Sequence, residues 1–262
     1  MARIDHGSSY ELIRNGVVLS ELAGYGNRAF CARHGAGAAL VMLGTYIIAP
    51  DKPAAYADDF FIVQGDRGYG GFLRDEIRAA RQSRAAVGVS VAAVDISEAA
   101  DFCAAAEAAG ARFVAVCLHS TYDVFTSTGT SAALCLRRNH GHLLAWARAM
   151  IYSVKVPVIF KVGVHDTPDT VQAAGVITGA GECIIHIDCG SSEQGSPGLE
   201  ALHEISRFSS FVIASGGIAD EDSACRVLRA GAGSVGIGRA AICDPLLCGR
   251  LQNVLRKNGS GE

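Results

Sequence analysis

The chain has 262 residues, 50% of them hydrophobic and 19% charged, with 31 glycines and 6 prolines. This length fits one large domain or two small ones, and the hydrophobic share excludes a disordered chain, which could not bury enough apolar surface to offset its ordering entropy. The net charge of -3 argues against a protein that binds polyanions through its overall charge.

Short β-branched segments alternate with alanine-rich amphipathic segments along the chain. The β-branched segments are nearly continuous in apolar character, which is typical of parallel strands covered on both faces. In chain order, strands are predicted over 17–22, 39–46, 87–93, 113–118, 157–162, 183–188, 211–215 and 234–238. Helices are predicted over 27–34, 72–83, 97–109, 137–153, 168–179, 198–207, 220–230 and 244–256.

Local signals support several helix boundaries. Asp95 supplies a capping side chain ahead of one helix, and Gly110 ends that helix. Thr167 and Pro168 place a cap and a first-turn proline before another, which Gly179 closes.

A strand followed by a helix, repeated eight times, predicts a (β/α)8 TIM barrel that forms a single domain over residues 1–262. A doubly wound open sheet is the alternative, because the pattern does not by itself show closure. One connection, at about 47–71, is longer than the others and contains Pro50, Pro53 and several glycines. A connection of this length is usually functional or mobile, and it would lie at the end of the barrel that carries active sites.

The cysteines and the first residues of the chain bear on where in the cell the protein is expected. The 9 cysteines include no CxxC pair and lie mostly in apolar contexts, so we expect buried reduced thiols and no metal site. The polar first residues lack the apolar core of a signal peptide, and no apolar run reaches the roughly 18 residues of a membrane-spanning helix. We therefore expect a cytoplasmic protein without a membrane partner.

Glycines follow the last two predicted strands. Ser215, Gly216 and Gly217 end one strand, and Gly238 and Arg239 end the next. In a barrel, the loops after strands seven and eight form a phosphate cradle, because glycine lets backbone N–H groups approach the phosphate oxygens. Arg239 can add a charged fork to the same group. The alternative is that these glycines only make tight turns.

Two polar residues interrupt apolar strands five and six. Lys161 must reach either the open mouth of the barrel or an anionic partner, because an unpaired buried charge is costly. His186 has a similar place on the next strand. The alternatives are a lysine that extends to the outer surface and a histidine satisfied in the core. Their position on neighbouring strands favours a shared site.

The loop after strand four offers proton donors. His119 and Ser120 lie there, at the predicted mouth of the barrel. They do not make a hydrolase triad, because adjacent side chains seldom point at each other, and no GxSxG elbow is present. Cys117 precedes them within the strand, and we expect its side chain to point in a different direction.

These residues together resemble the tRNA-dihydrouridine synthases, which are flavin-dependent (β/α)8 reductases, and especially their short archaeal relatives. The resemblance covers about residues 18–247. The motifs that carry it are Leu22-Ala23-Gly24, the strand-five Lys161, the strand-six His186, Ser215-Gly216-Gly217-Ile218, Gly238-Arg239-Ala240 and Asp244-Pro245.

The resemblance implies an FMN cofactor held by these motifs. The backbone at Ala23 and Gly24 would lie against the flavin ring, and Lys161 and Ser90 would contact its pyrimidine edge. His186 would lie beside the isoalloxazine. The phosphate would be bound by Ser215, Gly216, Gly217, Gly238 and Arg239.

The chain departs from the family in two places. Family members protonate the uracil with a cysteine after strand four, whereas this chain has His119 and Ser120 in that loop. The separate helical domain that grips tRNA is expected to be absent. The resemblance therefore implies reduction of a C=C bond, in tRNA uracil or a related substrate, with His119 or Ser120 as the proton donor and NADPH or NADH as the reductant.

Two alternatives remain open from the sequence. One is an FMN-dependent reductase of a small molecule, similar to the dihydroorotate dehydrogenases. The other is a phosphate-ligand-binding barrel without catalysis.

Overall fold

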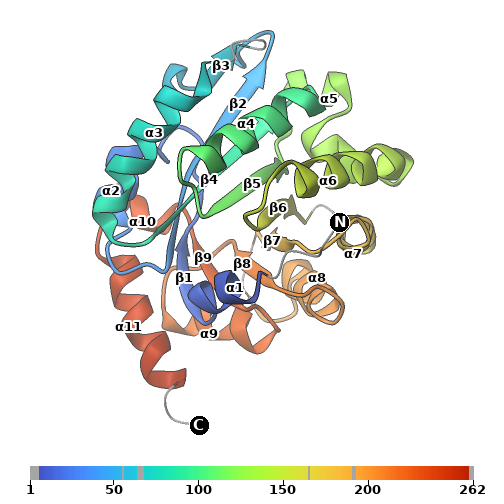
Figure 1. Cartoon of the computed structure of the whole chain (residues 1–262). Coiled ribbons are helices and arrows are strands. Elements are labelled where there is room, and N and C mark those ends of the chain that lie inside the picture. The colour runs from blue at the N-terminus through green and yellow to red at the C-terminus, as the bar shows by residue number, and fades with distance from the viewer. Residues whose placement is uncertain (1–5, 55, 64–67, 165, 191–192, 260–262) are drawn as a thin grey trace.

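The computed structural model describes residues 6–54, 56–63, 68–164, 166–190 and 193–259. Eight parallel strands form a closed barrel inside a ring of helices (Figure 1). In chain order these are β1 (Gly16–Leu19), β2 (Leu40–Ala49), β4 (Ala86–Ala93), β5 (Phe113–Leu118), β6 (Val158–Gly163), β7 (Ile184–Asp188), β8 (Val212–Ser215) and β9 (Ser234–Ile237). The order around the barrel is β1-β9-β8-β7-β6-β5-β4-β2, and pairing of β1 with β2 closes it. The predicted (β/α)8 barrel is confirmed, and the open sheet is excluded.

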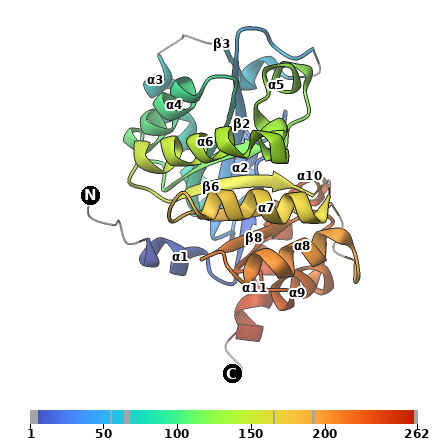
Figure 2. The same ribbon diagram turned by 90° about the vertical axis from the view of Figure 1, so that its right-hand side faces the viewer.

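The predicted helices are present, with ends shifted by a few residues. They are α2 (Arg28–His34), α3 (Tyr69–Ala80), α4 (Ile96–Ala108), α6 (His140–Ser153), α7 (Thr167–Thr178), α8 (Pro197–Ser206), α9 (Glu221–Arg229) and α11 (Leu247–Gly259). Asp95 caps α4 by accepting bonds from the N–H groups of Ser97 and Glu98. Asp166, rather than the predicted Thr167, caps α7. Figure 2 shows α6 and α7 side by side on the outside of β6.

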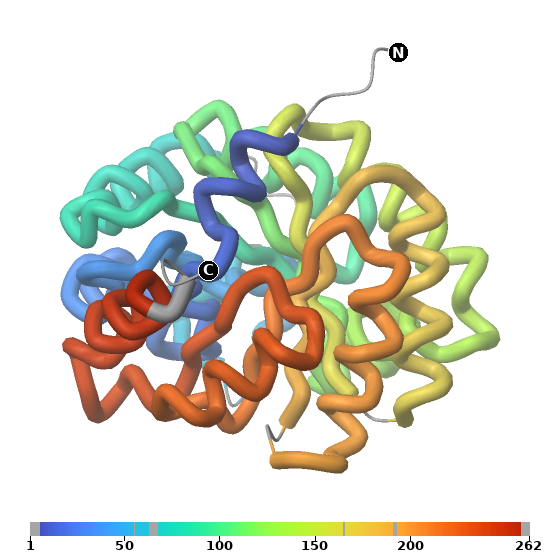
Figure 3. The backbone as a smooth tube through the Cα atoms, turned by 90° about the horizontal axis from the view of Figure 1, so that it is seen from below, coloured from blue at the N-terminus to red at the C-terminus, as the bar shows by residue number. Residues whose placement is uncertain are grey.

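Several short elements have no strong sequence signal. They are α1 (Gly7–Ile13), η1 (Asp58–Phe60), β3 (Phe61–Val63), η2 (Arg81–Ser83), α5 (Asp123–Thr128), η3 (Ser131–Cys135), η4 (Arg137–Asn139) and α10 (Ala240–Cys243). Helix α1 lies where the strands begin (Figures 1 and 3), and its Tyr10 and Ile13 pack against the apolar side chains inside the barrel. It therefore covers that end of the barrel.

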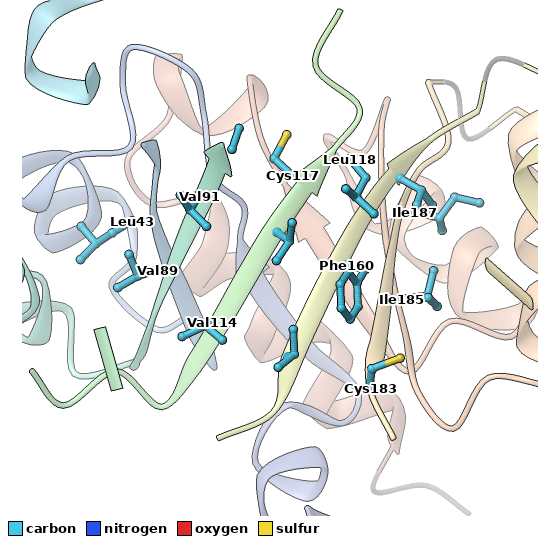
Figure 4. Close-up of a cluster of buried hydrophobic side chains, with 14 of the residues drawn as sticks. Leu43, Val89, Val91, Val114, Cys117, Leu118, Phe160, Cys183, Ile185 and Ile187 are labelled. Atoms are coloured by element: carbon cyan, nitrogen blue, oxygen red, sulfur yellow. The ribbon is translucent and has the colours of Figure 1, made fainter. Parts of the chain in front are cut away.

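The apolar core has two layers because side chains on a strand point alternately to opposite faces. On β5, Phe113 and Ala115 belong to the cluster inside the barrel, with Ile159 of β6. Val114 and Val116 belong to the larger cluster between the strands and the helices. Figure 4 shows labelled members of this larger cluster, among them Val89 of β4, Val114 of β5, Phe160 of β6 and Ile185 of β7.

The long connection predicted at 47–71 is partly regular. Strand β2 continues to Ala49, and β3 pairs with its last residues in parallel, Ile47 with Phe61 and Ala49 with Val63. Between them, the Tyr56 hydroxyl donates to the carbonyl of Thr45, so this segment folds back toward the end of the barrel. Residues 64–67 lie outside the described residues. Among the described helices, none combines the length and apolar character needed to cross a bilayer.

Candidate active site

Polar side chains gather where the strands end, above the apolar interior of the barrel. The strand register places Cys117 of β5 opposite Lys161 of β6, and Lys161 opposite His186 of β7. Residues paired in parallel strands face the same side of the sheet, so these three side chains share one layer at the mouth of the barrel. The register thus assembles a candidate site from three consecutive strands.

Lys161 has an acidic partner that the sequence analysis missed. The lysine is 4% exposed, and its Nζ lies 3.6 Å from Oε1 of Glu21, whose side chain is also buried. The predicted strand 17–22 ends at Leu19, so Glu21 belongs to the loop that follows β1 and not to a strand. The anionic partner expected for Lys161 is therefore present, and an acid immediately after an apolar strand was the signal for it.

His186 is held between two polar groups. Its Nε2 lies 2.9 Å from Oγ of Ser215, and its Nδ1 lies 3.8 Å from Oε2 of Glu21. Burial lowers the pKa of His186 well below its usual value, and the positive charges of Lys161 and His119 lower it further. The imidazole is thus neutral at neutral pH. Ser215, predicted as a phosphate contact, turns its hydroxyl toward His186.

Cys117 faces the mouth of the barrel, which corrects the expectation that it points elsewhere. Phe113 and Ala115 face the interior, and the alternation of the strand places Cys117 on the same side. Its Sγ lies 3.1 Å from Nδ1 of His119. Figure 4 shows Cys117 at the upper end of β5. A thiol is therefore present beside the proton donor that the sequence predicted.

The acid–base properties of Cys117 and His119 are coupled. Burial raises the pKa of the Cys117 thiol, but the His119 imidazolium and the Lys161 ammonium outweigh burial, and the pKa lies below its ordinary value. The pKa of His119 is raised, chiefly by the Cys117 thiolate and against the effect of burial. The pair therefore favours a thiolate beside an imidazolium.

No contact described for Ser120 joins its side chain to the layer of Cys117, Lys161 and His186. Its N–H donates to Oγ of Ser131, which in turn donates to the carbonyl of Cys117. Its own hydroxyl is buried and has no hydrogen-bond partner among the described residues. The loop after β5 is thus tethered by Ser131, and His119 is the better placed of the two predicted proton donors.

Ser90 of β4 pairs with Ala115 of β5, which faces the interior of the barrel. Ser90 is fully buried, and its Oγ lies 3.1 Å from Oγ1 of Thr45 on β2. Tyr56 lies nearby, and its ring meets that of Tyr122 edge-on at 5.6 Å. The hydroxyl of Ser90 is thus engaged by Thr45, and its contact with the flavin stays a prediction.

A cavity of about 220 Å³ joins this polar layer to the predicted phosphate cradle. Gly216, Gly217, Gly238 and Arg239 line it together with Lys161, and the carboxylates of Glu21 and Asp188 also reach it. From the loop after β1, the lining is Ser20, Glu21 and Leu22. The predicted contacts Ala23 and Gly24 are exposed and lie outside this lining.

Two glycines of the phosphate cradle, Gly216 and Gly238, differ in whether the structure has room for a side chain. Gly216 has a φ of +98°, and a Cβ there would lie 2.5 Å from the backbone N of Gly190. At Gly238, a Cβ would meet nothing closer than 3.4 Å, the Cδ2 of Leu22. Gly216 is thus required by the fold, whereas Gly238 leaves open space beside the backbone. Exposed backbone, the Arg239 guanidinium and the Lys161 ammonium on one cavity fit a phosphate-bearing ligand such as FMN.

The comparisons with known proteins agree with this geometry. Residues 123–261, somewhat more than half of the chain, match the family described as dihydrouridine synthase (Dus). The structure of the FabK (M276A) mutant from Thermotoga maritima resembles this one with a TM-score of 0.58 and 17% sequence identity. The likeness covers 90% of this chain and 64% of that chain, and it concerns the fold alone. No curated protein matches the sequence.

Proposed function

Because the chain belongs to the dihydrouridine synthase family, we propose that it is an FMN-dependent oxidoreductase that reduces the C=C bond of a uracil-type ring. The observation that carries the proposal is the single cavity shared by Lys161, the glycine cradle and Arg239. Two cations and open backbone on one cavity suit a ligand that carries a phosphate and a ring that becomes anionic on reduction.

The residues that would hold FMN divide into two groups. The backbone of Gly216, Gly217 and Gly238, with the guanidinium of Arg239, would bind the phosphate. Lys161 would face the pyrimidine edge of the ring, where its positive charge stabilises negative charge that develops on reduction.

The reaction needs a proton as well as a hydride. Reduced FMN, when bound, supplies the hydride to one carbon of the double bond, and the other carbon takes up a proton. Among the described side chains, His119 and Cys117 are the pair placed to supply it, with Sγ and Nδ1 3.1 Å apart. The pKa of His119 is raised, chiefly by the Cys117 thiolate, which favours the protonated form that a general acid needs. The proton passes to the substrate carbon by one of two routes. His119 gives it directly, or His119 first protonates the Cys117 thiolate and the resulting thiol gives it.

We propose uracil in tRNA as the substrate and NADPH or NADH as the electron donor, on the strength of the family. A small-molecule substrate is the second candidate, favoured by the net charge of -3 and by the carboxylates of Glu21 and Asp188 on the cavity. Acidic groups at this place disfavour a polyanion, whose binding depends on neutralising phosphates.

The first experiment is the visible absorbance spectrum of the purified protein, with the released chromophore identified by mass. FMN in the protein, reducible by a nicotinamide nucleotide, supports the reductase. Re-oxidation of the reduced protein under anaerobic conditions by unmodified tRNA, with dihydrouridine detected by nucleoside mass spectrometry, supports tRNA as the substrate. Re-oxidation only by free pyrimidines supports a small molecule. A protein that takes up no FMN leaves a phosphate-ligand-binding barrel.

A further inference from the structure

We propose that Glu21 sets the reduction potential of the flavin by opposing the charge of Lys161. The inference rests on the proposed FMN site and concerns a residue that the family motifs of this chain do not include. Its carboxylate lowers the potential, so the bound flavin is a stronger hydride donor than Lys161 alone would make it.

Glu21 is placed to act through its charge. Its side chain is 1% exposed, and its two oxygens lie 3.6 Å from Nζ of Lys161 and 3.8 Å from Nδ1 of His186. Neither oxygen has a hydrogen-bond partner among the described residues. Glu21 also lines the cavity that holds Lys161 and the glycine cradle. A carboxylate in this position acts on Lys161 through its charge. Its oxygens can still accept hydrogen bonds from a ligand in the cavity.

Glu21 is the carboxylate that the structure pairs with the Lys161 ammonium. His186 is neutral, since burial lowers its pKa well below the usual value. The pKa of Cys117 is lowered and that of His119 is raised, so both shifts favour a pair of opposite charges with little net charge. Asp188 is engaged by the N–H of Gly190, 3.0 Å away. Removing the charge of Glu21 would leave the Lys161 ammonium without the counter-charge that lies 3.6 Å from it.

Reduction of a flavin by two electrons and one proton adds negative charge to its pyrimidine ring. A positive environment favours that product, and a carboxylate disfavours it. At the effective dielectric constant of proteins, a unit charge within ~10 Å changes such an equilibrium by more than about tenfold. For a two-electron couple, a tenfold change corresponds to about 30 mV.

Glu21→Gln removes the charge and keeps the shape of the side chain. We expect the potential of bound FMN, measured against a reference dye during reduction by dithionite, to rise by at least about 30 mV. By thermodynamic linkage, the affinity for reduced FMN then rises about tenfold relative to the affinity for oxidised FMN. Glu21→Asp keeps the charge and should stay close to the parent.

Glu76→Gln is the matched control. Glu76 is another buried carboxylate, but it lies on α3 and contacts Arg28 and the Tyr46 hydroxyl, away from the cavity. Its replacement should leave the potential unchanged. If FMN bound to Glu21→Gln has the same reduction potential as FMN bound to the parent, or a lower one, the inference is overturned. The proposed function is then left intact. A parent protein that takes up no FMN overturns both.

Discussion

The Sγ of Cys117 lies 3.1 Å from Nδ1 of His119, two positions further along the chain. Strand alternation turns Cys117 into the mouth of the barrel, and His119, the first residue after β5, brings its ring beside the thiol. Lys161 lies opposite Cys117 in the register and adds a positive charge to the same place. A thiol that would be inert elsewhere in the core is thereby made acidic.

The first prediction tests this pair. His119→Gln removes the imidazolium that lowers the pKa of Cys117, so only the Lys161 ammonium then opposes burial and the thiol should titrate at a higher pH. The measurement is the pH dependence of thiolate absorbance in the ultraviolet, with Cys117→Ala as the blank. A titration that is unchanged in His119→Gln would show that the two groups are not coupled.

The second prediction separates the candidate proton donors. Cys117→Ala or His119→Gln should slow the re-oxidation of the reduced protein by its substrate by about 10²–10⁴-fold, the usual contribution of a general acid. Ser120→Ala should change the rate by less than about threefold, because no described contact brings its hydroxyl to Cys117 or His119. The reverse order of effects would return the role to Ser120. Stopped-flow absorbance of the flavin measures each rate.

The third prediction concerns Lys161. Lys161→Ala removes the buried ammonium beside Glu21 and should weaken FMN binding by at least about tenfold, since a bond to a charged group contributes about 1.5–3 kcal/mol. Lys155→Ala, an exposed lysine in the loop before β6, is the control. Fluorescence titration of apoprotein with FMN gives both affinities. Equal affinities for Lys161→Ala and the parent would remove Lys161 from the cofactor site.

The fourth prediction compares two glycines of the cradle. In Gly238→Ala the new methyl meets nothing closer than 3.4 Å, so the free energy of unfolding should change by less than about 0.5 kcal/mol while FMN binding weakens. In Gly216→Ala the positive φ and the close Gly190 backbone should cost more than about 1 kcal/mol in stability. Urea denaturation and FMN titration measure the two effects. Unchanged FMN affinity in Gly238→Ala would contradict its place in the cradle.

The fifth prediction is a loss of stability in mild acid. The pKa of His186 is well below its ordinary value of 6.5 in the folded protein, so below about pH 6.5 the unfolded chain binds a proton that the folded chain does not. The free energy of unfolding should therefore decrease as the pH falls below about 6.5, by up to about 1.4 kcal/mol per pH unit.

His186→Gln should flatten this dependence, because glutamine does not titrate. His203→Gln, on the exposed face of α8, should retain it. Urea denaturation at several pH values gives each slope. If the parent and His186→Gln show the same slope, His186 is not the residue that titrates on unfolding.

Most of the barrel could be predicted because its signals are local. Strand β5 has the predicted bounds, and Asp95 caps its helix as expected. Helix α1 and strand β3 were not predicted, because α1 is a short helix and β3 is stabilised by pairing with β2 rather than by its own three residues.

The candidate site was predicted in part. Lys161, His186 and the glycines were found from polar residues and glycines at strand ends. Glu21 was missed because it follows the end of β1, and Cys117 because its direction depends on where β5 ends. Ala23 and Gly24 were placed on the cavity from the resemblance, whereas the loop presents Ser20, Glu21 and Leu22 to it.

The sequence by itself determined the alternation of strands and helices, since strand and helix periodicity and caps are properties of neighbouring residues. Only the tertiary structure decided which charges meet. Glu21 and Lys161 are far apart in the chain and come within 3.6 Å because the barrel closes and brings the loop after β1 over the end of β6. Charge pairing of this kind depends on distance in space, and burial then strengthens it by excluding water.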